Sequence, residues 1–98
     1  MEVNIDKIKT LINNRFAFIK STYSVKRIGV FGSVARGDNK NRSDVDIVVE
    51  FLQPISMFKF IELEEYLGKL IGRQVDLVTK NALKPAIKED ILREVVYV

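Results

Sequence analysis

Two strand-like segments joined through a Gly-Ser turn constrain the fold of this chain most. Residues 25–31 (VKRIGVF) are rich in β-branched and aromatic side chains and stop at Gly32 and Ser33, which predicts a buried strand that breaks into a tight turn. After a polar segment, the chain re-enters extended structure at residues 44–51 (DVDIVVEF). We therefore expect a strand, a turn at Gly32, and a second strand that begins with carboxylates.

The turn at residues 32–37 (GSVARG) has the features of an anion site. The segment can form a short helical turn, and the first backbone N–H groups of such a turn have no partner inside it. Together with the Ser33 hydroxyl, these N–H groups would face an anion such as a phosphate. Taken alone, a Gly-Ser pair is also common in ordinary turns, so its meaning depends on its spacing to the next motif.

Asp44 and Asp46 are expected on one face of their strand, because side chains alternate along a strand, and Val45, Ile47 and Val49 on the other. Two carboxylates about 6 to 7 Å apart on a half-buried face repel each other, which is costly unless a cation lies between them. Mg²⁺ suits such a site, because it commonly binds one or two carboxylates together with substrate phosphates. Considered alone, the pair could instead be a solvated strand start.

A third carboxylate, Asp76, occupies a short apolar segment at residues 74–78 (QVDLV) that reads as another strand. If this strand lies beside the one at 44–51, Asp76 joins Asp44 and Asp46. Sites that transfer phosphoryl groups with two metal ions place those ions about 3.5 to 4 Å apart, and three carboxylates suffice to arrange them. The alternative for Asp76 is a position at an exposed sheet edge.

Helical patterns account for most of the remaining sequence. Apolar residues recur at helical spacing from Ile5 to Ile19, which predicts one amphipathic helix ending near residues 21–22. A second apolar stripe runs between residues 57 and 71 and stops at Gly72. Its apolar members are Met57, Phe60, Ile61, Leu63, Leu67, Leu70 and Ile71, and Phe58 and Tyr66 beside it are also expected in the core.

A last helix should begin at Pro85 and bury Ile87, Ile91 and Val95. The expected order of elements is αβαβαβα. This order predicts the α+β (α/β) class, a small mixed sheet with flanking helices, in a single domain over residues 1–98.

The composition of the 98 residues excludes several kinds of chemistry. The chain has no Cys and no His, so thiol catalysis, disulfides, histidine acid/base work and typical zinc sites are ruled out. No apolar run approaches the roughly 20 residues of a membrane span, and the N-terminus lacks a basic start followed by an apolar core. We therefore expect a cytoplasmic protein with no membrane association.

The spacing of the motifs resembles the polymerase-beta-like nucleotidyltransferases, whose signature is Gly-Ser, ten residues, Asp, any residue, Asp. Gly32, Ser33, Asp44 and Asp46 fit it without a gap. The resemblance is most specific to the minimal nucleotidyltransferases, or MNT-domain proteins, and covers nearly the whole chain. The further segments that carry it are residues 32–37 (GSVARG), 43–46 (SDVD), 75–78 (VDLV), 83–85 (LKP), 91–94 (ILRE) and 96–98 (VYV).

The resemblance implies roles for the residues of the nucleotide site. Gly32 and Ser33 would contact the β- and γ-phosphates of ATP. Arg36 matches a basic position of the motif and could meet triphosphate oxygens through its planar fork of donors, although a surface arginine is the alternative.

The resemblance also implies two Mg²⁺ ions. Asp44 and Asp46 would bind both ions, and Asp76 would help to bind the catalytic ion and activate the incoming hydroxyl group.

Members of this size resemble the antitoxin of a two-gene pair whose partner is a helical HEPN-domain ribonuclease. The implied activity is transfer of AMP from ATP to a tyrosine hydroxyl of that toxin, which blocks RNA cleavage. Two alternatives stay open: a non-catalytic antitoxin that neutralises its partner by binding alone, and an RNA- or DNA-binding domain. The net charge of +3 is spread along the chain, so nucleic acid is the weakest of the three.

Overall fold

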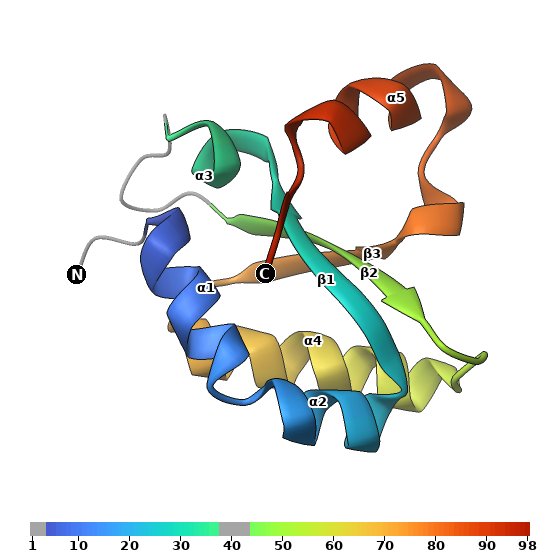
Figure 1. Ribbon diagram of the computed structural model, residues 1–98. Helices are drawn as coiled ribbons and strands as arrows, with labels where there is room; N and C mark the ends of the chain where they lie inside the picture. The colour runs from blue at the N-terminus through green and yellow to red at the C-terminus, as the bar shows by residue number, and fades with distance from the viewer. Residues whose placement is uncertain (1–3, 38–43) are drawn as a thin grey trace.

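A four-stranded mixed sheet forms the centre of the molecule, with helices on both of its faces (Figure 1). The computed structural model describes residues 4–37 and 44–98. In chain order the elements are α1 (Ile5–Asn13), α2 (Phe16–Tyr23), β1 (Val25–Phe31), α3 (Gly32–Arg36), β2 (Val45–Phe51), α4 (Met57–Ile71), β3 (Val75–Thr79), the 3-10 turn η1 (Lys80–Ala82), α5 (Pro85–Glu94) and β4 (Val96–Tyr97).

The strands follow the order β3-β2-β1-β4 across the sheet. β1 pairs antiparallel with both β2 and β4, and β2 pairs parallel with β3. The parallel pair is joined through α4, since parallel strands need a crossover connection. The expected α+β fold with a small mixed sheet is confirmed.

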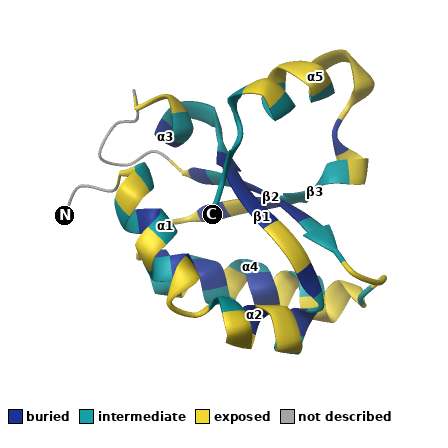
Figure 2. Cartoon of the chain, in the orientation of Figure 1, coloured by how far each residue is buried: buried dark blue, intermediate teal, exposed yellow. Residues whose placement is uncertain are grey.

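The core lies between the sheet and the layer of α1, α2 and α4 (Figure 2). Val45, Ile47 and Val49 of β2 point into it and are fully buried, as the predicted alternation requires. Burying an aliphatic side chain of this size stabilises the fold by about 1.5 to 3 kcal/mol. The other fully buried side chains of this core are Ile8, Ile12, Ile19, Val25, Ile28, Val30, Val34, Leu63 and Leu67.

The predicted single N-terminal helix is two helices. α1 ends at Asn13, and Arg15, with φ −117° and ψ 8°, leaves the helical conformation before α2 starts. Asn has a low helix propensity because its side chain competes for backbone hydrogen bonds, so the Asn13-Asn14 pair is a natural place for the break. The apolar spacing survives the break, because Ile8, Ile12 and Ile19 all reach the core.

The buried face of α4 is narrower than predicted and consists of Leu63, Leu67 and Ile71. Met57 and Phe58 are 70% and 87% exposed, so their expected burial was wrong, and Ile61 is 46% exposed. At about 100° per residue, Phe58 lies about 140° around the helix from Leu63 and Ile61 about 160° from it.

The expectation for Tyr66 on α4 is confirmed, because it packs against the core. Its ring centroid lies 5.4 Å from that of Phe18 and 6.2 Å from that of Tyr23. Gly72 ends α4 in the left-handed conformation, as predicted.

The end of the chain also differs from the prediction. Pro85 does start α5, but no residue of that helix is buried, Ile87 is 47% exposed, and Val95 follows the helix. The chain then forms β4, which the order αβαβαβα lacks: Val96 pairs with Val30 and Tyr97 with Gly29. α5 packs on α3 and β1 and stands over the sheet face that α1, α2 and α4 leave uncovered (Figure 1).

Among the residues that the structure describes, no helix has the length and apolar character needed to cross a membrane.

Candidate active site

Gly32 brings the backbone into contact with a carboxylate where β1 ends and α3 begins. Its φ of +76° lies in the left-handed region, which glycine adopts without strain. A Cβ atom at this position would overlap Oδ2 of Asp46. The neighbouring residue, Phe31, pairs with Asp46 across the β1–β2 ladder. Both the turn and the close approach therefore require glycine here.

The predicted short helical turn after Gly32 is α3, which contains Ser33 and Arg36. Gly37, with φ +78°, ends it in the left-handed conformation. α3 contacts both β1 and β2, so the turn lies against the sheet where β2 starts. The predicted polar loop, residues 38–43, lies outside the described residues.

The three predicted aspartates lie on neighbouring strands. Asp44 is exposed and directly precedes β2, and Asp46 is the half-buried second residue of that strand. Asp76 is exposed and pairs with Asp46 in the parallel β2–β3 ladder. The condition set from the sequence, that the strand of Asp76 lies beside the strand of Asp46, is therefore met.

The electrostatics of Asp46 reflect this crowding. Burial raises the pKa of its carboxyl group above the ordinary 3.8, and the charges of Asp76, Asp44 and Glu94 raise it further. Arg36 acts in the opposite direction and lowers that pKa. The ionised form of Asp46 is thus disfavoured by burial and then by several carboxylates, and it is supported by one nearby guanidinium group.

A metal ion would meet hard oxygen donors at this place. Across residues 4–37 and 44–98, no three His, Cys, Asp or Glu side chains are grouped tightly enough to hold a metal ion. The aspartates are therefore neighbours whose charges act on one another, not a closed set of ligands. Their chemistry fits Mg²⁺, because the repulsion that raises the pKa of Asp46 is what a cation among the carboxylates would relieve.

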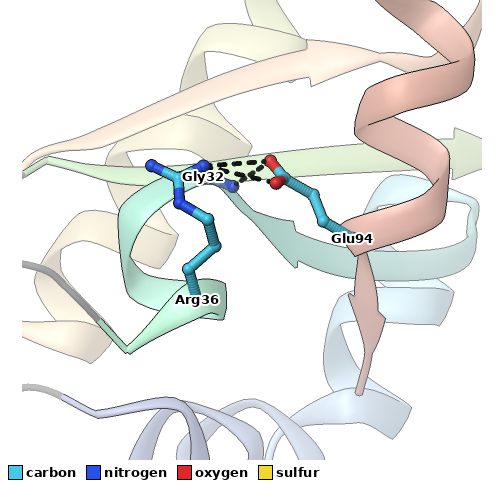
Figure 3. Close-up of polar contacts among 3 residues, drawn as sticks. All are labelled: Gly32, Arg36 and Glu94. Atoms are coloured by element: carbon cyan, nitrogen blue, oxygen red, sulfur yellow. Dashed lines mark hydrogen bonds and ion pairs between the residues drawn. The ribbon is translucent and has the colours of Figure 1, made fainter.

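Glu94 belongs to the site and was missed from the sequence. The N–H of Gly32 donates to its Oε1 over 3.0 Å, and Nη1 of Arg36 lies 3.3 Å from its Oε2 (Figure 3). The segment ILRE at 91–94 formed part of the family resemblance, which was the available signal. Nothing in its local pattern indicates a partner 62 residues earlier in the chain.

Comparisons with known proteins agree on the class. The family model described as "Nucleotidyltransferase domain" matches residues 12–98. A protein adenylyltransferase, MntA, of Thermococcus cleftensis is 47% identical over 96 residues, which are 98% of this chain and 97% of that protein. A proposed protein adenylyltransferase of Methanocaldococcus jannaschii is 44% identical over 95 residues, which are 96% of this chain and 97% of the relative.

Solved structures extend the likeness to the fold. A proposed minimal nucleotidyltransferase superposes with a TM-score of 0.74 at 34% identity and covers 91% of this chain and 93% of its own. A toxin-antitoxin crystal structure with AMP-PNP gives 0.69 at 22% identity, over 97% of this chain and 72% of that one. An MNT antitoxin in complex with a tri-AMPylated HEPN toxin of Shewanella oneidensis gives 0.65 at 18% identity, over 92% and 70%.

At these identities the two toxin-antitoxin structures carry information on the fold alone. The family model and the full-length relatives confirm the resemblance to minimal nucleotidyltransferases. This chain therefore belongs to the nucleotidyltransferase domain family and is an enzyme of that class.

Proposed function

We propose that this chain is an antitoxin that transfers AMP from ATP to a tyrosine hydroxyl of a HEPN-domain toxin in a reaction that requires Mg²⁺. One observation carries the proposal: the Gly32 turn approaches Asp46 closely, and Asp46 pairs with Asp76. The expected phosphate-binding turn and the carboxylates therefore meet at the same end of neighbouring strands. The full-length similarity to a protein adenylyltransferase supports a protein acceptor.

In this proposal Asp44, Asp46 and Asp76 hold two Mg²⁺ ions. When bound, the ions would offset the negative charge of the triphosphate and of the carboxylates. Gly32 and Ser33 face the β- and γ-phosphates from the start of α3, and Arg36 adds a planar pair of donors.

The reaction exchanges one bond to phosphorus for another. The acceptor oxygen forms a bond to the α-phosphorus of ATP, the bond from that phosphorus to the bridging oxygen breaks, and diphosphate leaves. Asp76 is the carboxylate proposed to take the proton of the attacking hydroxyl group, because it is exposed beside Asp46. Most of the rate enhancement would come from alignment and from charge stabilisation at the transferred phosphoryl group.

The toxin partner is proposed from the fold relatives. They include a toxin-antitoxin pair with AMP-PNP and an MNT antitoxin bound to a tri-AMPylated HEPN toxin. ATP and a tyrosine-bearing HEPN protein are therefore the substrates to test first.

A second candidate is an antitoxin that acts by binding alone. Exposed apolar side chains favour it, because they offer a contact surface that does not involve the aspartates. Among the described residues, the large ones are Phe18, Leu52, Met57, Phe58, Ile61 and Ile87.

The deciding experiment is the intact mass of the protein encoded beside this chain, which we expect to be a HEPN-domain toxin, after incubation with this chain, ATP and Mg²⁺. Whole increments of AMP are expected with the wild type and with Asp6→Asn, an exposed aspartate on α1 that serves as the matched control. Asp46→Asn should give none. A stable complex and loss of ribonuclease activity without any mass gain would instead establish inhibition by binding alone.

A further inference from the structure

The carboxylate of Glu94 accepts a hydrogen bond just beyond the end of the β1–β4 ladder, where the Gly32 turn begins. In the antiparallel β1–β4 ladder, Val30 pairs with Val96 and Gly29 with Tyr97. Two residues beyond Val30 is Gly32, and two residues before Val96 is Glu94, so the register brings them opposite each other. The Gly32 N–H donates to Oε1 of Glu94 at 3.0 Å, where a strand would supply a backbone carbonyl (Figure 3).

The backbone at Glu94 is fixed to the sheet. Val95 leaves the helix in an extended conformation, and β4 pairs with β1 immediately afterwards. The N–H of Val98 donates to the carbonyl of Ile28 at 3.0 Å, which extends the contact to the next residue pair. Glu94 is therefore held by the same strand that leads into Gly32, and it does not depend on a loop to reach the turn.

The two contacts of Glu94 act on the two ends of α3. Phe31, the residue that caps this helix, makes no side-chain hydrogen bond to its N-terminus, so Glu94 satisfies the first N–H from a distant part of the chain. At the other end of α3, Nη1 of Arg36 lies 3.4 and 3.3 Å from the two carboxylate oxygens. The start of the same helix lies against Asp46, because a Cβ atom at Gly32 would overlap Oδ2 of that residue.

We propose that Glu94 is a positioning residue of the nucleotide site, which fixes the Gly32 turn and holds the Arg36 guanidinium beside the carboxylates, where the triphosphate arrives. This inference rests on the proposed function and deepens it. The last segment of the chain becomes part of the nucleotide site, although Glu94 itself bonds to no substrate. Because the turn and the guanidinium group are already fixed before ATP binds, less conformational entropy is lost when ATP binds.

The contacts of Glu94 with Gly32 and Arg36 have a second interpretation, in which Glu94 competes with ATP, and experiment distinguishes the two. The Glu94 carboxylate is an anion, and the Gly32 N–H and Arg36 are also the donors expected to meet phosphate oxygens. If Glu94 competed with the triphosphate, its removal would strengthen ATP binding. If Glu94 positions the turn and Arg36, its removal weakens ATP binding, and the sign of the change decides.

The test compares Glu94→Gln and Glu94→Ala with the control Glu89→Gln. The control removes a charge from the same helix, at a side chain that is 87% exposed. Glu94→Gln keeps an oxygen acceptor for the Gly32 N–H and loses the ion pair with Arg36. It should raise the KM for ATP about three- to tenfold and leave kcat within about twofold. The reason is that a contact of equal strength in the ground state and the transition state changes KM and leaves kcat unchanged. Glu94→Ala loses both contacts and should raise KM by about tenfold or more.

Two further measurements follow the two contacts of Glu94 separately, and the first of them excludes a merely structural role. In an Arg36→Met background, Glu94→Gln should change KM by less than about twofold, because the two residues act as one unit. Amide hydrogen exchange at Gly32, followed by NMR, should accelerate about tenfold or more in Glu94→Ala and stay near the wild-type rate in Glu94→Gln.

A lower KM or tighter AMP-PNP binding in Glu94→Gln would overturn the proposal in favour of competition. Unchanged ATP parameters in both variants would also overturn it. If the wild type binds no ATP, the proposed function fails as a whole. The exchange rate of the Gly32 amide then still decides whether Glu94 holds the turn, so the two failures are distinguishable.

Discussion

The two faces of the sheet differ in what covers them and in what their residues do. Toward α1, α2 and α4, β2 presents Val45, Ile47 and Val49, all fully buried. Toward α3 and α5, the same region of the sheet presents the half-buried Asp46 and the exposed Asp76, and α5 buries none of its residues. Because side chains alternate along β2, two adjacent residues have different roles: Ile47 packs in the core, and Asp46 lies in the candidate active site.

This separation predicts that neighbouring substitutions have unlike effects. A change on the helix-covered face should act on the free energy of unfolding. A change to the carboxylates of the open face should act on AMP transfer and leave the fold intact.

The largest effect is expected at Asp46. Asp46→Asn removes a carboxylate from the proposed metal and nucleotide site and should lower the initial rate of AMP transfer by about a thousandfold or more. The protein should stay folded by circular dichroism, because the side chain lies outside the core. Transfer within about tenfold of wild type would remove Asp46 from the proposed mechanism.

The adjacent residue should show the reverse. Ile47→Ala deletes a fully buried side chain and should lower the free energy of unfolding by about 2 to 5 kcal/mol, measured by urea denaturation. At a low temperature where the variant remains folded, its rate of AMP transfer should be within a few-fold of wild type. A rate as low as that of Asp46→Asn would show that the two faces are not separable.

A third substitution examines the contact between the turn and the carboxylate. In Gly32→Ala the new methyl group must displace Asp46 Oδ2, and the rate of AMP transfer should fall about a hundredfold. Gly72→Ala is the matched control, because Gly72 has nearly the same φ, +79°, and nothing within 4 Å of the added Cβ. Both variants should lose about 1 to 2 kcal/mol of stability from backbone strain, and only Gly32→Ala should lose activity.

Much of this arrangement could be predicted from local sequence. The alternation in residues 44–51, the break at Gly32 and the apolar strand around Asp76 each follow from short-range rules and are found in the structure. What the sequence does not encode locally is register. The pairing of Asp46 with Asp76 could be stated only as a condition, because it depends on which strands become neighbours.

Glu94 and Phe58 illustrate two of the ways in which sequence reasoning failed. Glu94 meets Gly32 through the pairing of β4 with β1, and a two-residue strand gives no periodic signal. The sequence predicts Phe58 in the core because it is apolar and lies beside an apolar stripe, yet it is on the opposite side of α4 from Leu63. An apolar residue type says less about burial than its angular position around the helix does.

The smallest expected effect concerns stability, and it joins the open face to the metal proposal. The folded-state pKa of Asp46 is raised above 3.8, so the folded protein binds this proton more tightly than the unfolded chain does. The stabilisation that this proton gives the folded state is complete below pH 3.8 and is lost as the pH rises through the raised pKa.

Without Mg²⁺, the Tm of Asp46→Asn should therefore match that of wild type at low pH and exceed it by about 1 to 5 °C at pH 7. Added Mg²⁺ should raise the wild-type Tm and close this gap, because a cation among the carboxylates relieves the repulsion that the substitution removes. A gap that Mg²⁺ leaves unchanged at pH 7 would argue against metal binding at Asp46.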